Sequence, residues 1–145
     1  LGAKVTYNNP YNSYYKAGGD STLTDGVCGT WNNNDQRWQG FIRNIDLQVD
    51  LGQEKEVSNV SLSFLQILGP EIYLPAEVQM TFLAEDNSQL VEASTPMPSE
   101  QYETPYVVAP YNVELVEPVK ARYINIKCPR TARMGWLFLD EIVVK

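Results

Sequence analysis

The sequence predicts an all-β fold in which short antiparallel strands form a sandwich or jelly roll. Polar and apolar residues alternate with a period of two in several separate segments, which is typical of strands with one buried face. Clusters of Gly, Pro, Asn and Asp separate these segments. No stretch keeps a helical period for three turns. Many short strands joined by such turns favour two packed sheets.

Residues 1–46 are predicted to be rich in loops, with a short extended piece at 4–7. Their turn signals are Asn8-Asn9-Pro10, Gly18-Gly19-Asp20, Asp25-Gly26 and Asn32-Asn33-Asn34-Asp35. Long loops in a compact domain usually have a function, such as holding an ion or a ligand. We therefore expect this segment to carry part of a site.

Strands are predicted from Ile45 onward, at 46–52, 57–68, 77–84, 89–93, 106–117, 121–127 and 136–145. Within 57–68, Val60, Leu62 and Phe64 are expected to point to one face, and Ser61 and Ser63 to the other. Within 77–84, the same pattern sets Val78, Met80 and Phe82 against Gln79, Thr81 and Leu83. Residues 85–88 are expected to form a hairpin turn, and 94–105 a polar connection.

The length favours a single domain, residues 1–145, and the charge restricts the classes of partner. The net charge of −7 opposes binding to nucleic acid and makes a membrane surface a poor partner. The absence of His excludes Ser-His triads and His metal sites. A metal site would need hard oxygen ligands, as calcium does, or the two cysteines. The sequence shows no transmembrane run and no signal peptide, and because it begins at Leu1 we expect a piece of a longer protein.

The two cysteines leave two alternatives open. Cys28 and Cys128 could form a disulfide, which would close a loop of about 100 residues and stabilise the fold by roughly 4–5 kcal/mol in the entropic model. Alternatively, both are buried free thiols.

Several motifs resemble those of the discoidin family, the coagulation factor V/VIII type C domains. The strand Asp46-Leu47-Gln48-Val49-Asp50-Leu51-Gly52 is similar to a family strand, as are Ala121-Arg122-Tyr123-Ile124-Asn125-Ile126 and Leu139-Asp140-Glu141-Ile142. Other segments resemble the C-terminal module of bacterial β-N-acetylhexosaminidases, especially those of gut Bacteroidetes. These segments are 4–11, 17–19, 23–26, 37–41 and 64–66.

The resemblance implies a galactose-binding-like jelly roll of about eight antiparallel strands. It also implies a non-catalytic carbohydrate-binding module. Its expected partner is a galactose-type or N-acetylhexosamine-type glycan or a parent catalytic domain. The parent would be a glycosidase that is secreted, periplasmic or held on the outer surface of a bacterium. We expect the module to be a monomer.

The resemblance further implies a structural calcium ion. Its ligands would be the carboxylates of Asp25 and Glu141, the oxygens of Thr30, and carbonyl groups at Leu23 (or Thr22) and at Cys28 (or Val27). Gly26 and Gly29 would let the loop curl around the ion. The alternative is that Asp25-Gly26 is only a turn and Glu141 a surface carboxylate.

Three loops, at 31–38, 69–74 and 129–136, are candidates for a sugar site, because sugars need aromatic platforms with polar groups beside them. The candidate contacts are Trp31, Asn34, Arg37, Trp38, Tyr73, Arg133 and Trp136. The alternative for the three tryptophans is that they pack inward. Glu71 stands where an aromatic residue is expected, and the loop before Gly135 lacks the Trp and His that relatives often carry. Both departures make a degenerate or retargeted pocket an open alternative.

Three other function classes compete with glycan binding. A structural module that packs on the catalytic domain is favoured by the short loops. An adhesion domain would need apolar spikes beside basic residues, which a charge of −7 disfavours. An enzyme could use two carboxylates, such as Asp35, Asp46 or Glu71, but the acidic residues are scattered through loops and turns.

Overall fold

The computed structural model describes residues 2–30, 32–98 and 103–145, and its regular secondary structure is almost entirely β-strand. The strands are β1 (Lys4–Tyr7), β2 (Gln39–Phe41), β3 (Ile45–Ile67), β4 (Glu77–Leu83), β5 (Gln89–Pro96), β6 (Tyr106–Cys128) and β7 (Leu137–Val144). Two single 3-10 turns, η1 (Ser13–Tyr15) and η2 (Thr22–Thr24), lie in the N-terminal segment. No helix among the described residues is long and apolar enough to cross a bilayer. The predicted all-β fold is confirmed.

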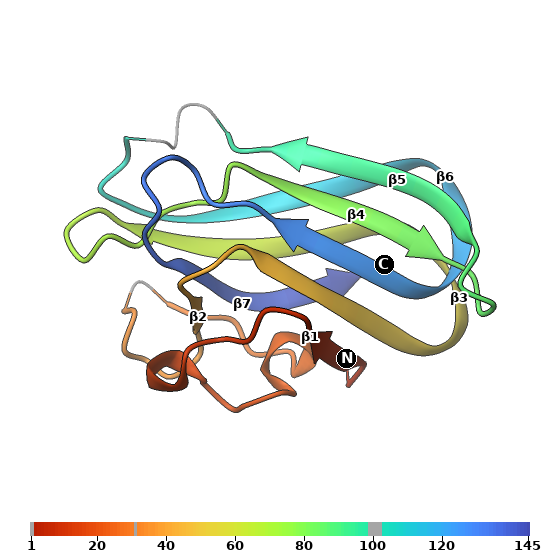
Figure 1. The fold of residues 1–145 in the computed structure, drawn as a ribbon, viewed down its shortest axis with the longest axis horizontal. Helices are drawn as coiled ribbons and strands as arrows, with labels where there is room; N and C mark the ends of the chain where they lie inside the picture. The colour runs from red at the N-terminus through yellow and green to blue at the C-terminus, as the bar shows by residue number, and fades with distance from the viewer. Residues whose placement is uncertain (1, 31, 99–102) are drawn as a thin grey trace.

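The strands form two layers because β3 and β6 each belong to both (Figure 1). The front layer contains β5, β4, the second half of β6, the first half of β3, and β1. The back layer contains the first half of β6, the second half of β3, β7 and β2. All of these strand pairs are antiparallel, with β3 and β6 in register from Ile45–Cys128 to Ile67–Tyr106. This is the architecture of an open β-sandwich.

The structure corrects the predicted strand boundaries at the corners of the sandwich. The predicted strands 46–52 and 57–68 are one strand, β3, and the predicted strands 106–117 and 121–127 are one strand, β6. Register shifts between Asp50 and Lys55 and between Val57 and Asn59 let both strands turn from one layer into the other. β5 also continues to Pro96, into the predicted connection, and β2 lies inside the segment predicted to be loops.

The main core lies between the two layers and follows the predicted alternation. Val60, Leu62 and Phe64 of β3 are fully buried, whereas Ser61 and Ser63 are half-buried on the other face. On β4, Val78, Met80 and Phe82 belong to the same core. Burial of each such side chain contributes about 1.5–3 kcal/mol to folding. The alternation of apolar and polar residues therefore explains why the two layers pack against each other through their apolar faces.

A second, smaller core covers the outer face of the back layer. It consists of Trp38, Leu65, Ile67, Ile72 and Phe138. Leu65 and Phe138 reach this face because they follow Phe64 and Leu137, which face the main core. Tyr15 packs on Phe138 with ring centroids 4.6 Å apart. The loop-rich N-terminal segment is thus fixed on the sandwich by its own apolar contacts.

The structure also separates the two cysteines. Cys28 is exposed in the N-terminal segment, Cys128 is fully buried at the end of β6, and both thiols are free. The disulfide alternative is therefore not formed here. The alternative of buried thiols holds for Cys128 and is wrong for Cys28.

Candidate functional site

The loops after β3 and before β7 join each other through their backbones. The Tyr73 N–H donates to the Trp136 carbonyl, and the Trp136 N–H donates to the Glu71 carbonyl, both at 2.9 Å. Gly135 is required at this junction, because a Cβ atom there would lie 2.2 Å from the Glu71 carbonyl oxygen. Two of the three candidate loops, 69–74 and 129–136, are therefore joined into one rigid surface.

Tyr73 and Arg133 meet on this surface. The Arg133 guanidinium lies 5.0 Å from the centre of the Tyr73 ring, a cation–π contact. The same guanidinium forms an ion pair with Glu103 at 2.6 Å. The structure therefore brings two predicted sugar-binding residues together, with one face of the tyrosine ring already covered by the arginine.

The tryptophans and Arg37 have different surroundings. Trp38 is 1% exposed, and its Nε1 donates to the Thr30 carbonyl, so it packs under the loop and offers no platform. Trp136 is half-buried, with its ring edge-on to Tyr15 at 5.1 Å. The exposed Arg37 reaches the Cys28 carbonyl at 3.4 Å. Trp31 lies outside the described residues.

A cavity of about 380 Å³ opens between the η1 turn and the loop before β2. Its lining residues are Ser13, Tyr14, Tyr15, Lys16, Ala17, Asn33, Asn34, Gln36 and Trp38. Tyr14 is 88% exposed, so its ring is free to cover the C–H face of a ligand. Two Asn amides and one Gln amide supply donors and acceptors for hydroxyl groups. The cavity combines an aromatic surface with amides, which is the chemistry a sugar needs.

Tyr14 and Tyr15 were not predicted from the sequence to line a site, whereas Asn34 and Trp38 were. The available signal was the adjacent tyrosine pair in a segment already expected to carry a site. A second signal is conformational: Ala17 and Gln36 line the cavity with φ values of 48° and 64°. Such left-handed backbone is unfavourable for residues with a Cβ and concentrates at functional sites.

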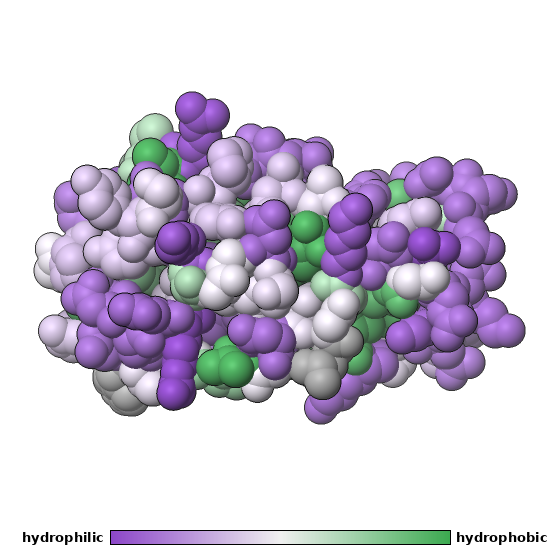
Figure 2. All heavy atoms as spheres, turned by 90° about the horizontal axis from the view of Figure 1, so that it is seen from below, coloured by the Kyte–Doolittle hydropathy of each residue, from purple (hydrophilic) through white to green (hydrophobic). Residues whose placement is uncertain are grey.

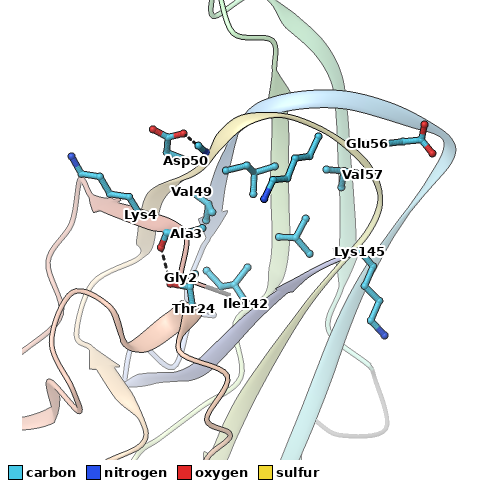
Figure 3. Close-up of a pocket in the computed structure, with 14 residues that line it drawn as sticks. Gly2, Ala3, Lys4, Thr24, Val49, Asp50, Glu56, Val57, Ile142 and Lys145 are labelled. Carbon is cyan, nitrogen blue, oxygen red and sulfur yellow. Dashed lines mark hydrogen bonds between the residues drawn. The ribbon is translucent and has the colours of Figure 1, made fainter.

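A second hollow, of about 370 Å³, lies beside both ends of the chain (Figure 3). Val49, Val57 and Ile142 form an apolar floor, and Lys4 and Lys145 lie on opposite sides of it. None of its lining residues is aromatic. It therefore lacks the flat apolar platform on which sugars stack, and the cavity beside Tyr14 is the better candidate for a glycan.

The surface that carries the N-terminal segment is mostly hydrophilic (Figure 2). Apolar residues form only small, separate patches on this face. Membrane and protein adhesion surfaces normally present a larger continuous apolar patch. This face offers no such patch.

A calcium site at the predicted ligands needs six to eight oxygens directed at one point. Among the described residues, no three Asp, Glu, Cys or His side chains converge in this way. The Thr30 hydroxyl donates to Asp35 at 2.7 Å, and an Asp25 carboxylate oxygen accepts from the Val27 N–H at 2.8 Å. Of the predicted carbonyl ligands, the Thr22 carbonyl accepts from the Asp25 N–H at 3.3 Å, and the Cys28 carbonyl accepts from Arg37 at 3.4 Å. In this arrangement the residues do not fit a calcium ion, and calcium binding stays a prediction.

Glu141 lies beside the Asp25 loop, as expected, but it accepts a hydrogen bond there. Its Oε2 accepts from the Gly26 N–H at 2.7 Å. The neighbouring Asp140, which the sequence analysis did not single out, accepts from the Gly29 N–H at 2.8 Å. Burial raises the pKa of the Asp140 carboxyl to about 6 and that of the Glu141 carboxyl to about 7. The signal for Asp140 was two adjacent acidic residues inside an otherwise apolar strand.

No protein-family model and no curated protein sequence matches this chain. Solved structures do match its fold. The lectin domain of lectinolysin, in complex with Lewis B antigen, has a TM-score of 0.67 at 16% identity, over 99% of this chain and 92% of that one. A family 32 carbohydrate-binding module of Clostridium perfringens, in complex with galactose, has a TM-score of 0.63 at 15% identity, over 98% and 92%.

A third similar structure is a family 29 fucosidase of Ruminococcus gnavus, in complex with fucose. It has a TM-score of 0.63 at 17% identity, and the match covers 99% of this chain but only 25% of the fucosidase chain. At these identities the similarity establishes the fold alone. The chain has the galactose-binding-like jelly roll found in carbohydrate-binding modules, some of which belong to glycoside hydrolases.

Proposed function

We propose that the protein is a non-catalytic carbohydrate-binding module whose ligand lies in the cavity beside Tyr14. The observation that carries the proposal is the composition of this cavity, which is lined by an exposed tyrosine and by Asn33, Asn34 and Gln36. The fold supports it, because the similar structures include modules solved with Lewis B antigen and with galactose. The contact of Tyr15 with Trp136 links the cavity to the Tyr73–Arg133 surface.

We further propose that the module belongs to a bacterial glycosidase of the β-N-acetylhexosaminidase type that acts outside the cytoplasm. The sequence motifs described above support this parent. The fucosidase match supports a glycosidase in general, because a module of this fold forms part of that longer chain. The sequence of the full-length protein tests the proposal directly, and a catalytic domain other than a glycosidase would contradict it.

The binding proposal is tested with a glycan array followed by calorimetry on the best ligand. We expect binding to a galactosyl or N-acetylhexosaminyl glycan. Tyr14→Ala should weaken it about tenfold, since aromatic anchors carry much of the binding energy. Asn34→Ala should also weaken glycan binding, because a hydroxyl group of the glycan would lose its hydrogen-bond partner. Tyr123→Ala, on the outer face of the front layer, is the matched control and should bind normally. No binding to any glycan by the wild-type module would overturn the proposal.

One observation favours a structural module as the alternative. Trp38 is buried and Arg133 is paired with Glu103, so two predicted sugar contacts are already engaged within the chain. A structural module would stabilise the parent enzyme. Deleting it should then lower the melting temperature of the parent, whereas an unchanged melting temperature would exclude this alternative.

A further inference from the structure

The two acidic residues of β7 lie in a β-bulge. β3 and β7 are in register at Leu62–Ile142 and again at Phe64–Leu139. Asp140 and Glu141 therefore both lie opposite Ser63. In a regular strand, adjacent side chains point to opposite faces, but a bulge lets two successive side chains lie on one side. The bulge thus explains why both carboxylates reach the same loop.

Both carboxylates bind backbone N–H groups at the two ends of a short loop. Glu141 accepts from Gly26 and Asp140 accepts from Gly29. The two side chains belong to buried residues, 6% and 1% exposed. A carboxyl oxygen accepts a hydrogen bond in either protonation state, and such a bond is stronger away from water. These two contacts therefore tie the N-terminal segment to the last strand of the fold.

Two peptide groups of this loop, those before Gly26 and Gly29, point the opposite way from what a cation held by these carboxylates needs. A trans peptide is planar, so an N–H that points at a carboxylate sends the carbonyl of the preceding residue the other way. The Cys28 carbonyl accordingly faces away from Asp140, and it accepts from Arg37. Asp140 and Glu141 still have one buried oxygen each without a partner among the described residues, at Oδ1 and Oε1. An experiment must therefore separate a bound cation from the N–H contacts.

The loop held by these carboxylates also supports the cavity. Gly29 lies directly on the Trp38 ring, since a Cβ on Gly29 would be 2.2 Å from Trp38 Cε2. Trp38 in turn donates to Thr30 and forms part of the cavity wall together with Asn34. A continuous series of contacts thus runs from Asp140 through Gly29 and Trp38 to the cavity.

We propose that Asp140 and Glu141 form a cation-independent clasp that fastens the Gly26–Gly29 loop to β7 and positions the Trp38 wall of the cavity. The attachment of the Gly26–Gly29 loop to β7 is inferred from the two hydrogen bonds alone. The positioning of a ligand cavity rests on the proposed glycan-binding function. In this role the two acids are positioning residues, since they act through the loop.

The first experiment measures thermal unfolding and amide hydrogen exchange of the wild-type protein in calcium and in EDTA. The clasp predicts the same melting temperature in both, and slow exchange of the Gly26 and Gly29 amides in both. A melting temperature that calcium raises by several degrees, with the effect absent in Glu141→Gln, would overturn the proposal in favour of a calcium site.

Two pairs of variants separate the clasp from a metal site further. Asp140→Asn and Glu141→Gln keep an acceptor oxygen and should retain most of the amide protection. Asp140→Ala and Glu141→Ala remove the acceptor, and the facing glycine amide should exchange about tenfold faster or more. Glu92→Ala, an exposed acid on β5, is the control. Unchanged exchange in both alanine variants would contradict the clasp, and if these variants do not fold, the Asn and Gln variants decide.

Glycan affinity then distinguishes this inference from the proposed function. In a folded Asp140→Ala variant we expect weaker glycan binding, with Trp38 in a changed environment in the NMR spectrum of its indole N–H. Normal glycan affinity despite a lost clasp would show that the clasp positions nothing. A wild-type protein that binds no glycan but shows protected, calcium-independent glycine amides would remove the proposed function and leave the clasp standing.

Discussion

Gly29 and Trp38 are packed so closely that the identity of residue 29 is set by space. A Cβ at this position would lie 2.2 Å from the indole ring, well inside van der Waals contact. Gly69 is a useful contrast, because a Cβ there meets no atom within 4 Å. The same type of residue is therefore required at one position and replaceable at the other.

Gly29→Ala should destabilise the protein, because either the loop or the Trp38 ring must move. Forcing extra atoms into a packed region costs about 1–3 kcal/mol, which corresponds to a fall in melting temperature of roughly 2–10 °C for a domain of this size. Thermal denaturation followed by circular dichroism measures this. Gly69→Ala is the control, and equal melting temperatures for the two variants would show that the contact is not made.

Asp50 and Arg122 form the best-defined ion pair of the front layer. The Arg122 guanidinium contacts both carboxylate oxygens of Asp50, at 2.6 and 3.3 Å, and also Glu85. The guanidinium holds the pKa of Asp50 below its ordinary value. A lowered pKa in the folded state means that the pair stabilises the fold above the unfolded pKa, and that this contribution is lost as the pH falls through the folded pKa.

Arg122→Gln should therefore raise the pKa of Asp50 toward its ordinary value, as measured by NMR titration of the carboxyl carbon. The difference in stability between wild type and variant should be small, since both side chains are partly exposed, and it should shrink on acidification. A titration curve of Asp50 that the variant leaves unchanged would argue against the pair.

At the scale of elements, the alternation of residues predicted which side chains face the core, but it did not predict how the strands continue. Gly52 ends the predicted strand 46–52, and Pro118 lies in the gap between the predicted strands 106–117 and 121–127; both residue types weaken strands. In the structure, Gly52 adopts a φ of 86° at the corner and the ladder resumes beyond it. Whether a glycine ends a strand or bends it depends on the strand that pairs with it. The residues around the glycine do not show which strand that is.

The two cysteines lie in elements of different accessibility, which predicts their reactivity. A thiol reagent should modify Cys28 in the folded protein and reach Cys128 only on unfolding, because Cys128 is fully buried at the end of β6. Reaction of Cys28 should be slower than that of a free thiol at neutral pH, since desolvation and the nearby Asp140 and Glu141 raise its pKa.

Titration of thiols before and after denaturation measures this difference, and Cys28→Ser should remove the fast reaction alone. No reactive thiol in the denatured, unreduced protein would reveal a disulfide and contradict the structure.

At the scale of the whole molecule, the sequence predicted the fold class and the meeting of two candidate loops better than the directions of individual side chains. The predicted loops after β3 and before β7 do join, and Tyr73 and Arg133 meet there. The direction of Trp38 could not be predicted, because it follows from the second core on the outer face of the back layer. Tyr14 was missed for a related reason: the cavity exists only where η1 returns beside the loop before β2.

The most direct test of glycan binding at this cavity is a titration of the protein with glycans, followed by two-dimensional NMR of its backbone and side-chain amides. The account predicts that a galactosyl or N-acetylhexosaminyl glycan shifts the signals of Tyr14, Asn33 and Asn34, with smaller shifts near Tyr73 and Arg133. It also predicts no shifts on the outer face of the front layer. Shifts confined to that face, or to the hollow beside the chain ends, would contradict it.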